Sequence, residues 1–330
     1  MQLKPDQQPP ATAITSPHHQ PLPLRIISHN IRYAANPFQR FPTEPPWNPT
    51  RRQLLARQLL HLTRPRFSPA HTVIFLQEVL HEQFRDVSTA LGRSWEGLGV
   101  GRDDGKQAGE YEGVWFRREA WKLVGWGTRW LNEDGSVGKR GWDAASVRVA
   151  TAVVLDARKG DGRGIGEEDE EGEEGHGVRR GRRVLFLNTH FDDQGVVARR
   201  ESAKLLLSIL AELKQRYEPD YWVVGGDLNS PQSDEAYEIL ASKESGLVDA
   251  RMVVSNDMVW GEENTYTGFD GEGDVDEGPT RIDFLFVPNS SDGSRKGGVQ
   301  GYAVTPNTFE DGSDGRVSDH RAVVVDTVVE

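Results

Sequence analysis

The sequence contains no cysteine among its 330 residues. This absence excludes disulfide bonds, and it excludes metal sites that are built on thiolate ligands. It also removes the usual indication of compartment, because a chain without thiols tolerates oxidising and reducing surroundings alike. Any metal ion that the chain binds must therefore be held by oxygen or imidazole ligands.

Long hydrophobic runs are also missing. No segment approaches the ~18 consecutive apolar residues that a membrane-spanning helix requires. Residues 1–22 lack the apolar core of a signal peptide. We therefore expect no membrane span. The sequence does not identify a compartment, so the cytoplasm is taken as the default, and no obligate protein partner is indicated.

Positive charge is in short supply. Lys and Arg number 39 against 51 Asp and Glu, which gives a formal net charge of −12. Proteins that grip long nucleic acids carry a basic face, because contacts from Lys and Arg to phosphates dominate their affinity. Among phosphate-bearing ligands, this balance favours a small molecule or a few nucleotides over a long duplex.

Two low-complexity segments divide the chain. Residues 1–22 are rich in Pro and Gln and are predicted to form a disordered leader. Residues 157–183 combine many glycines with an acidic block, which is typical of a solvated loop between two strands; a regulatory element is the alternative. The remainder, 23–330, is predicted to be one domain that carries this acidic insertion.

Apolar, β-branched runs alternate with amphipathic segments in the rest of the chain. Helices are predicted to begin at Asn48-Pro49, with Asn48 as the N-cap, and to cover 80–91 and about 195–216. Strands are predicted at 22–31, 71–79, 111–117, 121–130, 145–156, 183–190, 221–227, 281–287 and 320–328. Two halves with strands covered by helices indicate an α/β (α+β) fold. We expect a four-layered α-β-β-α sandwich of two packed mixed sheets.

Polar side chains stand at the ends of these apolar strands or inside them. They are all carboxylates, amides or imidazoles: Asn30, Glu78, His190, Asp227, Asn229, Asp283, Asp319 and His320. A single such residue is best explained as a turn or cap. Several of them indicate a common site, because charged groups seldom adjoin buried strands unless they are paired or bind an ion. Oxygen ligands favour a hard cation, Mg²⁺ or Mn²⁺.

The motifs around these residues carry a family resemblance. HNIRY, LQEV, NTHFDDQG, GDLNS, RIDFLFV and SDHRAV occur in the order found in the endonuclease/exonuclease/phosphatase superfamily. The resemblance extends from about residue 24 to 328. Residues 99–118 and 141–151 are more narrowly similar to a branch found in bacteria and fungi. The resemblance implies a deoxyribonuclease-like sandwich and metal-dependent hydrolysis of phosphate esters.

The resemblance also implies roles for individual residues. Glu78 and Asn30 would hold the metal, and Asp319 would complete or adjoin that site. Asp227 would orient or deprotonate the attacking water, and Asn229 would donate to the phosphoryl group. The developing charge would be stabilised by His320, which Asp283 would hold in orientation.

Four further residues are assigned by the same resemblance. His190 would assist the leaving oxygen, held in its charged form by Glu110; a structural histidine is the alternative. Arg148 matches a basic position that faces the phosphate, although a surface arginine on a strand would look the same. Trp142 would wall the substrate pocket, or simply belong to the core.

Three functions remain open at this point. The first is a phosphatase or phosphodiesterase that acts on a small phosphorylated substrate, and the acidic body favours it. The second is a 3′-5′ RNA exonuclease of the nocturnin or deadenylase type, which the pairing of His190 with Glu110 would support. The third is a catalytically silent binding module of the same fold, which is disfavoured because every expected position holds a competent residue.

Overall fold

The computed structural model of the chain describes residues 20–66, 68–158, 181–273, 278–289, 298–309 and 315–330. Most of the predicted leader, and all but a few residues of the predicted acidic insertion, lie outside these ranges.

The first sheet has seven strands in the order β10-β12-β13-β1-β2-β4-β3. At its centre β1 runs parallel to β2 and antiparallel to β13, so the carboxyl ends of β1 and β2 share one edge. Its strands are β1 (Leu22–Asn30), β2 (His71–Val79), β3 (Trp95–Leu98), β4 (Tyr111–Arg117), β10 (Val259–Gly261), β12 (Gly298–Val304) and β13 (Val323–Val329).

The second sheet has six strands in the order β5-β6-β7-β8-β11-β9. Here β7 and β8 are the parallel pair, and β11 runs antiparallel to β8. Its strands are β5 (Trp121–Trp130), β6 (Val149–Ala157), β7 (Arg183–His190), β8 (Tyr221–Asp227), β9 (Leu247–Asp249) and β11 (Asp283–Pro288).

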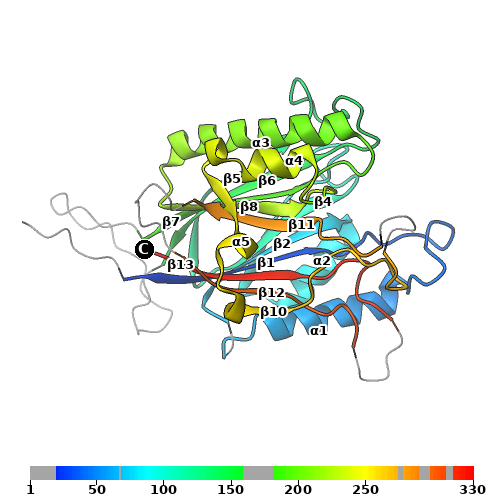
Figure 1. Ribbon diagram of the computed structural model, residues 1–330. Coiled ribbons are helices and arrows are strands. Elements are labelled where there is room, and N and C mark those ends of the chain that lie inside the picture. Colours follow the sequence, from blue (N-terminus) through cyan, green and yellow to red (C-terminus); the bar gives the residue numbers. More distant parts are fainter. Residues whose placement is uncertain (1–19, 67, 159–180, 274–277, 290–297, 310–314) are drawn as a thin grey trace, which may run out of the picture.

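The helices cover the two outer faces. Figure 1 shows α3 (Val196–Tyr217) and α4 (Glu235–Ala241) over the second sheet, with α1 (Arg52–Leu62) and α2 (His81–Leu91) on the opposite side of the molecule. The short helix α5 (Ala250–Val253) follows β9. The result is the four-layered sandwich of two packed mixed sheets that the sequence predicts.

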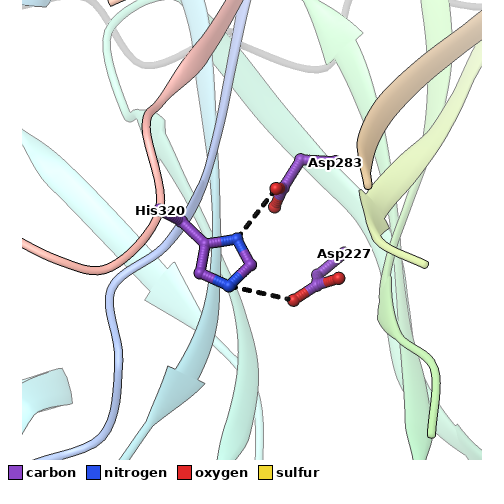
Figure 2. Close-up of side chains that lie close together, drawn as sticks. All are labelled: Asp227, Asp283 and His320. Carbon is purple, nitrogen blue, oxygen red and sulfur yellow. Dashed lines mark hydrogen bonds and ion pairs between the residues drawn. The ribbon is translucent and has the colours of Figure 1, made fainter. Parts of the chain in front are cut away.

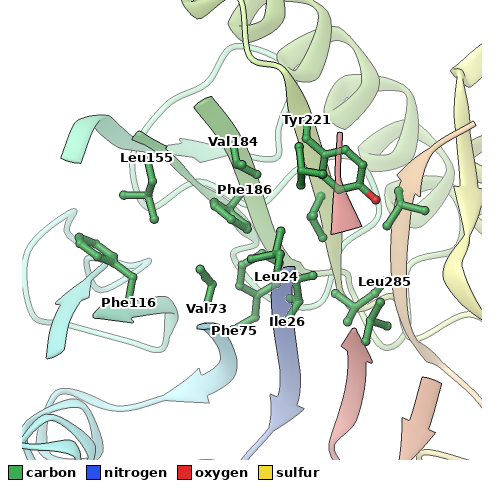
Figure 3. Packing of buried hydrophobic residues seen from close by; sticks show 14 of the residues in the cluster. Leu24, Ile26, Val73, Phe75, Phe116, Leu155, Val184, Phe186, Tyr221 and Leu285 are labelled. Atoms are coloured by element: carbon green, nitrogen blue, oxygen red, sulfur yellow. The ribbon is translucent and has the colours of Figure 1, made fainter. Parts of the chain in front are cut away.

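The core between the sheets is formed by the inward faces of both. Figure 3 shows Phe75 of the first sheet close to Phe186 of the second, and their ring centroids lie 6.2 Å apart at a near-perpendicular angle. Separate buried clusters fill the spaces between each sheet and its helices, including Leu55 and Trp115 on one side and Leu206 and Phe284 on the other. Burial on both faces explains why the central strands are continuous apolar runs.

The boundaries of the central strands agree with the predictions to within a few residues, and the largest differences are at the starts of β6, predicted at 145 and found at Val149, and of β13, predicted at 320 and found at Val323. Asn48 has extended φ and ψ of −103° and 127°, which is the backbone conformation of an N-cap, and the regular α-helix runs from Arg52 to Leu62; a capping bond from the Asn48 side chain stays a prediction. The elements β3, β9, β10, β12, α4 and α5 were not predicted; they are short, and they lack the continuous apolar runs that mark the central strands. No helix in the described part of the chain has the length and apolarity needed to cross a membrane.

Candidate active site

Three neighbouring strands of the second sheet bring polar side chains to one edge. His190 at the end of β7 is in register with Asp227 at the end of β8, and Asp227 is in register with Asp283 at the start of β11. All three side chains are buried. Two carboxylates directly opposite each other on adjacent strands repel, so this edge requires a compensating positive charge.

His320, just before β13 of the first sheet, supplies that charge. Its Nδ1 lies 2.8 Å from Oδ2 of Asp283, and its Nε2 lies 3.7 Å from Oδ2 of Asp227 (Figure 2). Burial alone would lower the pKa of His320, but the charges of Asp283 and Asp227 outweigh it and raise the pKa to about 10. The imidazole is therefore a cation held between two acids at neutral pH.

The carboxyl group of Asp227 has a strongly perturbed pKa. Burial and the negative charge of Asp283 raise its pKa to about 7, although the cation of His320 acts in the opposite direction. A carboxyl that takes and releases a proton near neutral pH is suited to general acid–base chemistry.

Asn30 joins the two sheets at the site. Its Nδ2 donates to Oε1 of Glu78 at 2.8 Å and to Oδ2 of Asp227 at 2.9 Å. Its Oδ1, the only atom of Asn30 able to bind a cation, accepts from the backbone N–H of Arg32 at 2.9 Å. In this arrangement Asn30 positions two carboxylates, and its own ligand role stays a prediction.

Glu78 and Asp319 form a second pair of acidic residues in the site, in addition to Asp227 and Asp283. Burial raises the pKa of Asp319, and so does the negative charge of Glu78. Burial would also raise the pKa of Glu78, but Arg32 and the amide of Asn30 reverse this and lower it. Glu78 has a φ of +59°, a strained backbone conformation of the kind that collects at functional sites.

These two carboxylates fit a divalent cation. Asp319 is buried and Glu78 is partly buried, the two repel each other, and both are hard oxygen donors of the type that Mg²⁺ and Mn²⁺ take. A second group, Asp227 with Asp283 and His320, also offers ligand atoms within 4.8 Å of one another. A cation there would have to displace the proton that His320 shares with Asp283, so Glu78 and Asp319 are the better candidates.

His190 lies next to Asn229 and Arg148. Its Nε2 is 2.9 Å from Nδ2 of Asn229, and its Nδ1 is 3.0 Å from a terminal nitrogen of Arg148. Burial and the positive charge of Arg148 lower the pKa of His190 well below its usual value. The expectation of a charged imidazole at this position is therefore wrong.

Glu110 does not pair with His190 as expected. Its Oε2 accepts a 2.6 Å hydrogen bond from the guanidinium of Arg102, while both ring nitrogens of His190 face other groups. Burial raises the pKa of Glu110 to about 6, against the opposing effect of Arg102. Glu110 lines the cavity, but it makes no hydrogen bond with His190 in the described part of the chain, so the predicted pairing of the two is not found.

One cavity of about 1030 Å³ unites these groups. Its lining includes Glu78, Glu110, Arg148, His190, Asp227, Asn229, Asp319 and His320. Trp142 is not among the lining residues, and its backbone N–H instead donates to Glu133 at 3.1 Å. The prediction that Trp142 walls the pocket is therefore not supported by the shape of this cavity.

Several lining or supporting residues were missed by the sequence reasoning. Arg32 lies 3.6 Å from Glu78 and stacks over the ring of Tyr33 at 4.1 Å. Asp192 holds Arg148, and the ring of Tyr266 meets that of His320 at 5.1 Å. Arg32 and Asp192 belong to the motifs HNIRY and NTHFDDQG, so a signal existed for both; Tyr266 lies in none of them.

The two packed mixed sheets form a deoxyribonuclease-like sandwich, and carboxylates and imidazoles gather at one edge of it. The chain belongs to the Endonuclease/Exonuclease/phosphatase family, whose sequence profile matches residues 27–320. No curated protein sequence matches the chain.

Solved structures show the same fold. An endonuclease/exonuclease/phosphatase from Bacteroides vulgatus is 29% identical, with a TM-score of 0.71 over 93% of this chain and 99% of that chain. A mannosyl-6-phosphatase from Bacteroides thetaiotaomicron is 26% identical, with a TM-score of 0.71 over 92% and 99%. The human nocturnin catalytic domain, at 19% identity and a TM-score of 0.60 over 94% of each chain, shares the fold.

Proposed function

We propose that this protein is a divalent-metal-dependent hydrolase of phosphate esters that acts on a small phosphorylated substrate. The observation that carries the proposal is the meeting of two polar groups at one cavity. One is His320 with Asp227, which Asp283 supports from behind the lining, and the other is Glu78 with Asp319.

Glu78 and Asp319 would hold the cation. When bound, Mg²⁺ or Mn²⁺ would draw negative charge from the nonbridging oxygens of the phosphoryl group. Asn30 fixes the orientation of Glu78 through its 2.8 Å hydrogen bond, so the carboxylate does not have to be ordered when the ion arrives.

Asp227 is our candidate for the group that orients and deprotonates the attacking water. It is buried at the cavity wall, and its pKa of about 7 matches the requirement that a base take up a proton near neutral pH. Asn30 and the backbone N–H of Asn229 each donate to it, at 2.9 Å and 2.8 Å, and they hold its two oxygens in place.

His320 would donate to the phosphoryl oxygens while their charge develops. Its bond to Asp283 keeps the ring oriented and protonated, so the donor is in place before the substrate binds. Asn229, with a φ of +46° directly after β8, lines the same cavity; its Nδ2 donates to the backbone oxygen of Phe191 at 2.9 Å and lies 2.9 Å from Nε2 of His190, so it would bind another phosphoryl oxygen by exchanging one of these contacts.

The charges of the cavity favour a small substrate over a nucleic acid strand. Its lining includes three arginines, and each is paired with a carboxylate: Arg32 with Glu78, Arg102 with Glu110, and Arg148 with Asp193. Paired arginines offer little positive field to a chain of phosphates. The mannosyl-6-phosphatase at 26% identity supports the same substrate class.

A turnover screen tests this function. Sugar phosphates, inositol phosphates, nucleotides and short poly(A) are offered with Mg²⁺, with Mn²⁺ and with EDTA, and phosphate release is measured. We expect hydrolysis of a small phosphate ester that vanishes in EDTA and returns with either ion. Full activity in EDTA would overturn the metal, and turnover of poly(A) alone would overturn the substrate class.

A further inference from the structure

We propose that Arg148 and Asp192 are positioning residues that hold His190 as a neutral imidazole with its proton on Nε2. In this state His190 presents an N–H at the cavity wall, beside Asp227 and Asn229, and carries no charge. The state of the ring concerns the resting protein; only its catalytic consequence rests on the proposed function.

Three groups surround the ring of His190, which is 3% exposed. A terminal nitrogen of Arg148 lies 3.0 Å from Nδ1. Nδ2 of Asn229 lies 2.9 Å from Nε2, and Oδ2 of Asp227 lies 3.5 Å from the same atom. Arg148 and the amide nitrogen of Asn229 are donors, whereas Asp227 is an acceptor.

A neutral imidazole carries one proton, and the two possible positions can be compared. With the proton on Nε2, Nδ1 accepts from Arg148 and the proton lies on the atom 3.5 Å from Oδ2 of Asp227, so only the 2.9 Å contact with Nδ2 of Asn229 is unfavourable. With the proton on Nδ1, Nε2 accepts from Nδ2 of Asn229, but an N–H faces a guanidinium that cannot lose its charge, and the oxygen of Asp227 faces a lone pair. Charge-assisted hydrogen bonds are the stronger ones, so the first arrangement prevails.

A second proton is excluded by the same neighbour. The imidazolium would place Nδ1–H against the permanent cation of Arg148, and both side chains are buried. The like charges would repel at 3.0 Å with little screening. His190 is therefore a donor whose charge does not change.

Arg148 can impose this state because it is itself fixed. Its side chain is buried; its Nε donates to Oδ2 of Asp192 at 3.3 Å, and another terminal nitrogen donates to Asp193 at 2.7 Å. A planar guanidinium bound at three nitrogens has one orientation.

Asp192 anchors this arrangement. Its oxygens accept from the backbone N–H groups of Ala145 at 3.0 Å, Ser146 at 2.9 Å and Gly195 at 2.8 Å, in addition to Arg148. These donors come from the segment before β6 and from the turn before α3. Because the Asp192 carboxylate is hydrogen-bonded to both segments, it fixes the position of the Arg148 guanidinium.

The consequence for the reaction is specific. A neutral Nε2–H stabilises charge on a leaving or nonbridging oxygen by hydrogen bonding, but it does not deliver a proton and recharge at each turnover. Removal of the guanidinium should therefore lower kcat more than it raises KM, whereas loss of a phosphate ligand would raise KM.

Nitrogen-15 NMR of the histidine-labelled protein tests the proposal. Long-range proton–nitrogen correlations show which ring nitrogen carries the proton, and the His190 signals are assigned by their loss in His190→Gln. We expect the Nε2–H form at neutral pH in the wild type. We expect a mixture of forms in Arg148→Lys and in Asp192→Asn, with no change in the exposed control Arg129→Lys. An Nδ1–H form or an imidazolium in the wild type would overturn the assignment, even if the variants fail to fold.

Kinetics provide the second readout. Arg148→Lys should lower kcat by about 10²-fold, as expected when a reacting group is misplaced, and should change KM by less than about threefold. A rise in KM with unchanged kcat would make Arg148 a phosphate ligand and refute its positioning role. If no phosphate ester is turned over at all, the proposed function fails while the NMR result still decides the state of His190.

Discussion

Glu112, on β4 beneath the site, allows a quantitative test of the electrostatics of this interior. Its side chain is 1% exposed, and neither of its carboxyl oxygens has a hydrogen-bond partner within the described part of the chain. Oε1 of Gln77, on the neighbouring strand β2, also lacks a donor there. Burial, and then the negative charge of Glu110, raise the pKa of Glu112 well above its ordinary value of 4.5.

The sign of the effect follows from proton binding. Between pH 4.5 and its native pKa, Glu112 keeps a proton that the unfolded chain has lost, so unfolding releases a proton. Stability therefore falls as the pH rises across this window, by about 1.4 kcal/mol per pH unit. Glu112→Gln keeps the shape, cannot ionise and avoids this loss. The variant should be more stable than the wild type, and its advantage should grow by about 1.4 kcal/mol per pH unit.

Urea unfolding followed by tryptophan fluorescence measures this difference at about pH 5, 6 and 7. The matched control is Glu238→Gln on the exposed face of α4, which should leave the pH dependence unchanged. A stability difference that is flat with pH, or a variant less stable than the wild type throughout, would refute the claim that Glu112 is protonated in the native state.

Two further predictions concern the acidic insertion and the substrate. Replacing 160–181 with a short Gly/Ser linker should leave kcat and KM within about twofold of wild type. The reason is that Asp156 and Arg183, which flank the insertion, lie about 20 Å from the site along β6 and β7. A large rise in KM would make the insertion part of substrate selection. KM for a small phosphate ester should change little with salt, whereas a grip on single strands gives a log–log slope of about −0.7 per phosphate; a steep slope would favour the exonuclease.

The sequence predicts the central strands and the positions of the acidic residues well, because both depend on local pattern. A buried strand such as 71–79 or 221–227 is a continuous apolar run, and the polar residue that ends it is visible in the sequence. The parallel pairs β1–β2 and β7–β8 then bring those ends to one edge. Because the central strands are buried on both faces, their apolar runs and the polar residues that end them can be recognised in the sequence, and those polar residues form the site.

The partners within the site could not be predicted in the same way. Arg148 meets His190 because β6 and β7 are neighbours in register, and Glu110 meets Arg102 because the loop between them folds back on itself. The order of the motifs in the sequence does not reveal the contact between Arg148 and His190 or the one between Glu110 and Arg102. The family resemblance identified which residues gather, but the charge state of His190 depends on which cation or acid lies against it. That contact is a property of the packed chain.

The effect of Asp227 and His320 on kcat tests the central claim most directly. Asp227→Asn and His320→Ala are compared with wild type on the best small phosphate ester, with saturating Mg²⁺, and thermal melting is recorded for each variant. We predict that each substitution lowers kcat by about 10²–10³-fold or more while the melting curve remains that of a folded protein. A folded variant that retains a tenth of the wild-type kcat would contradict the account.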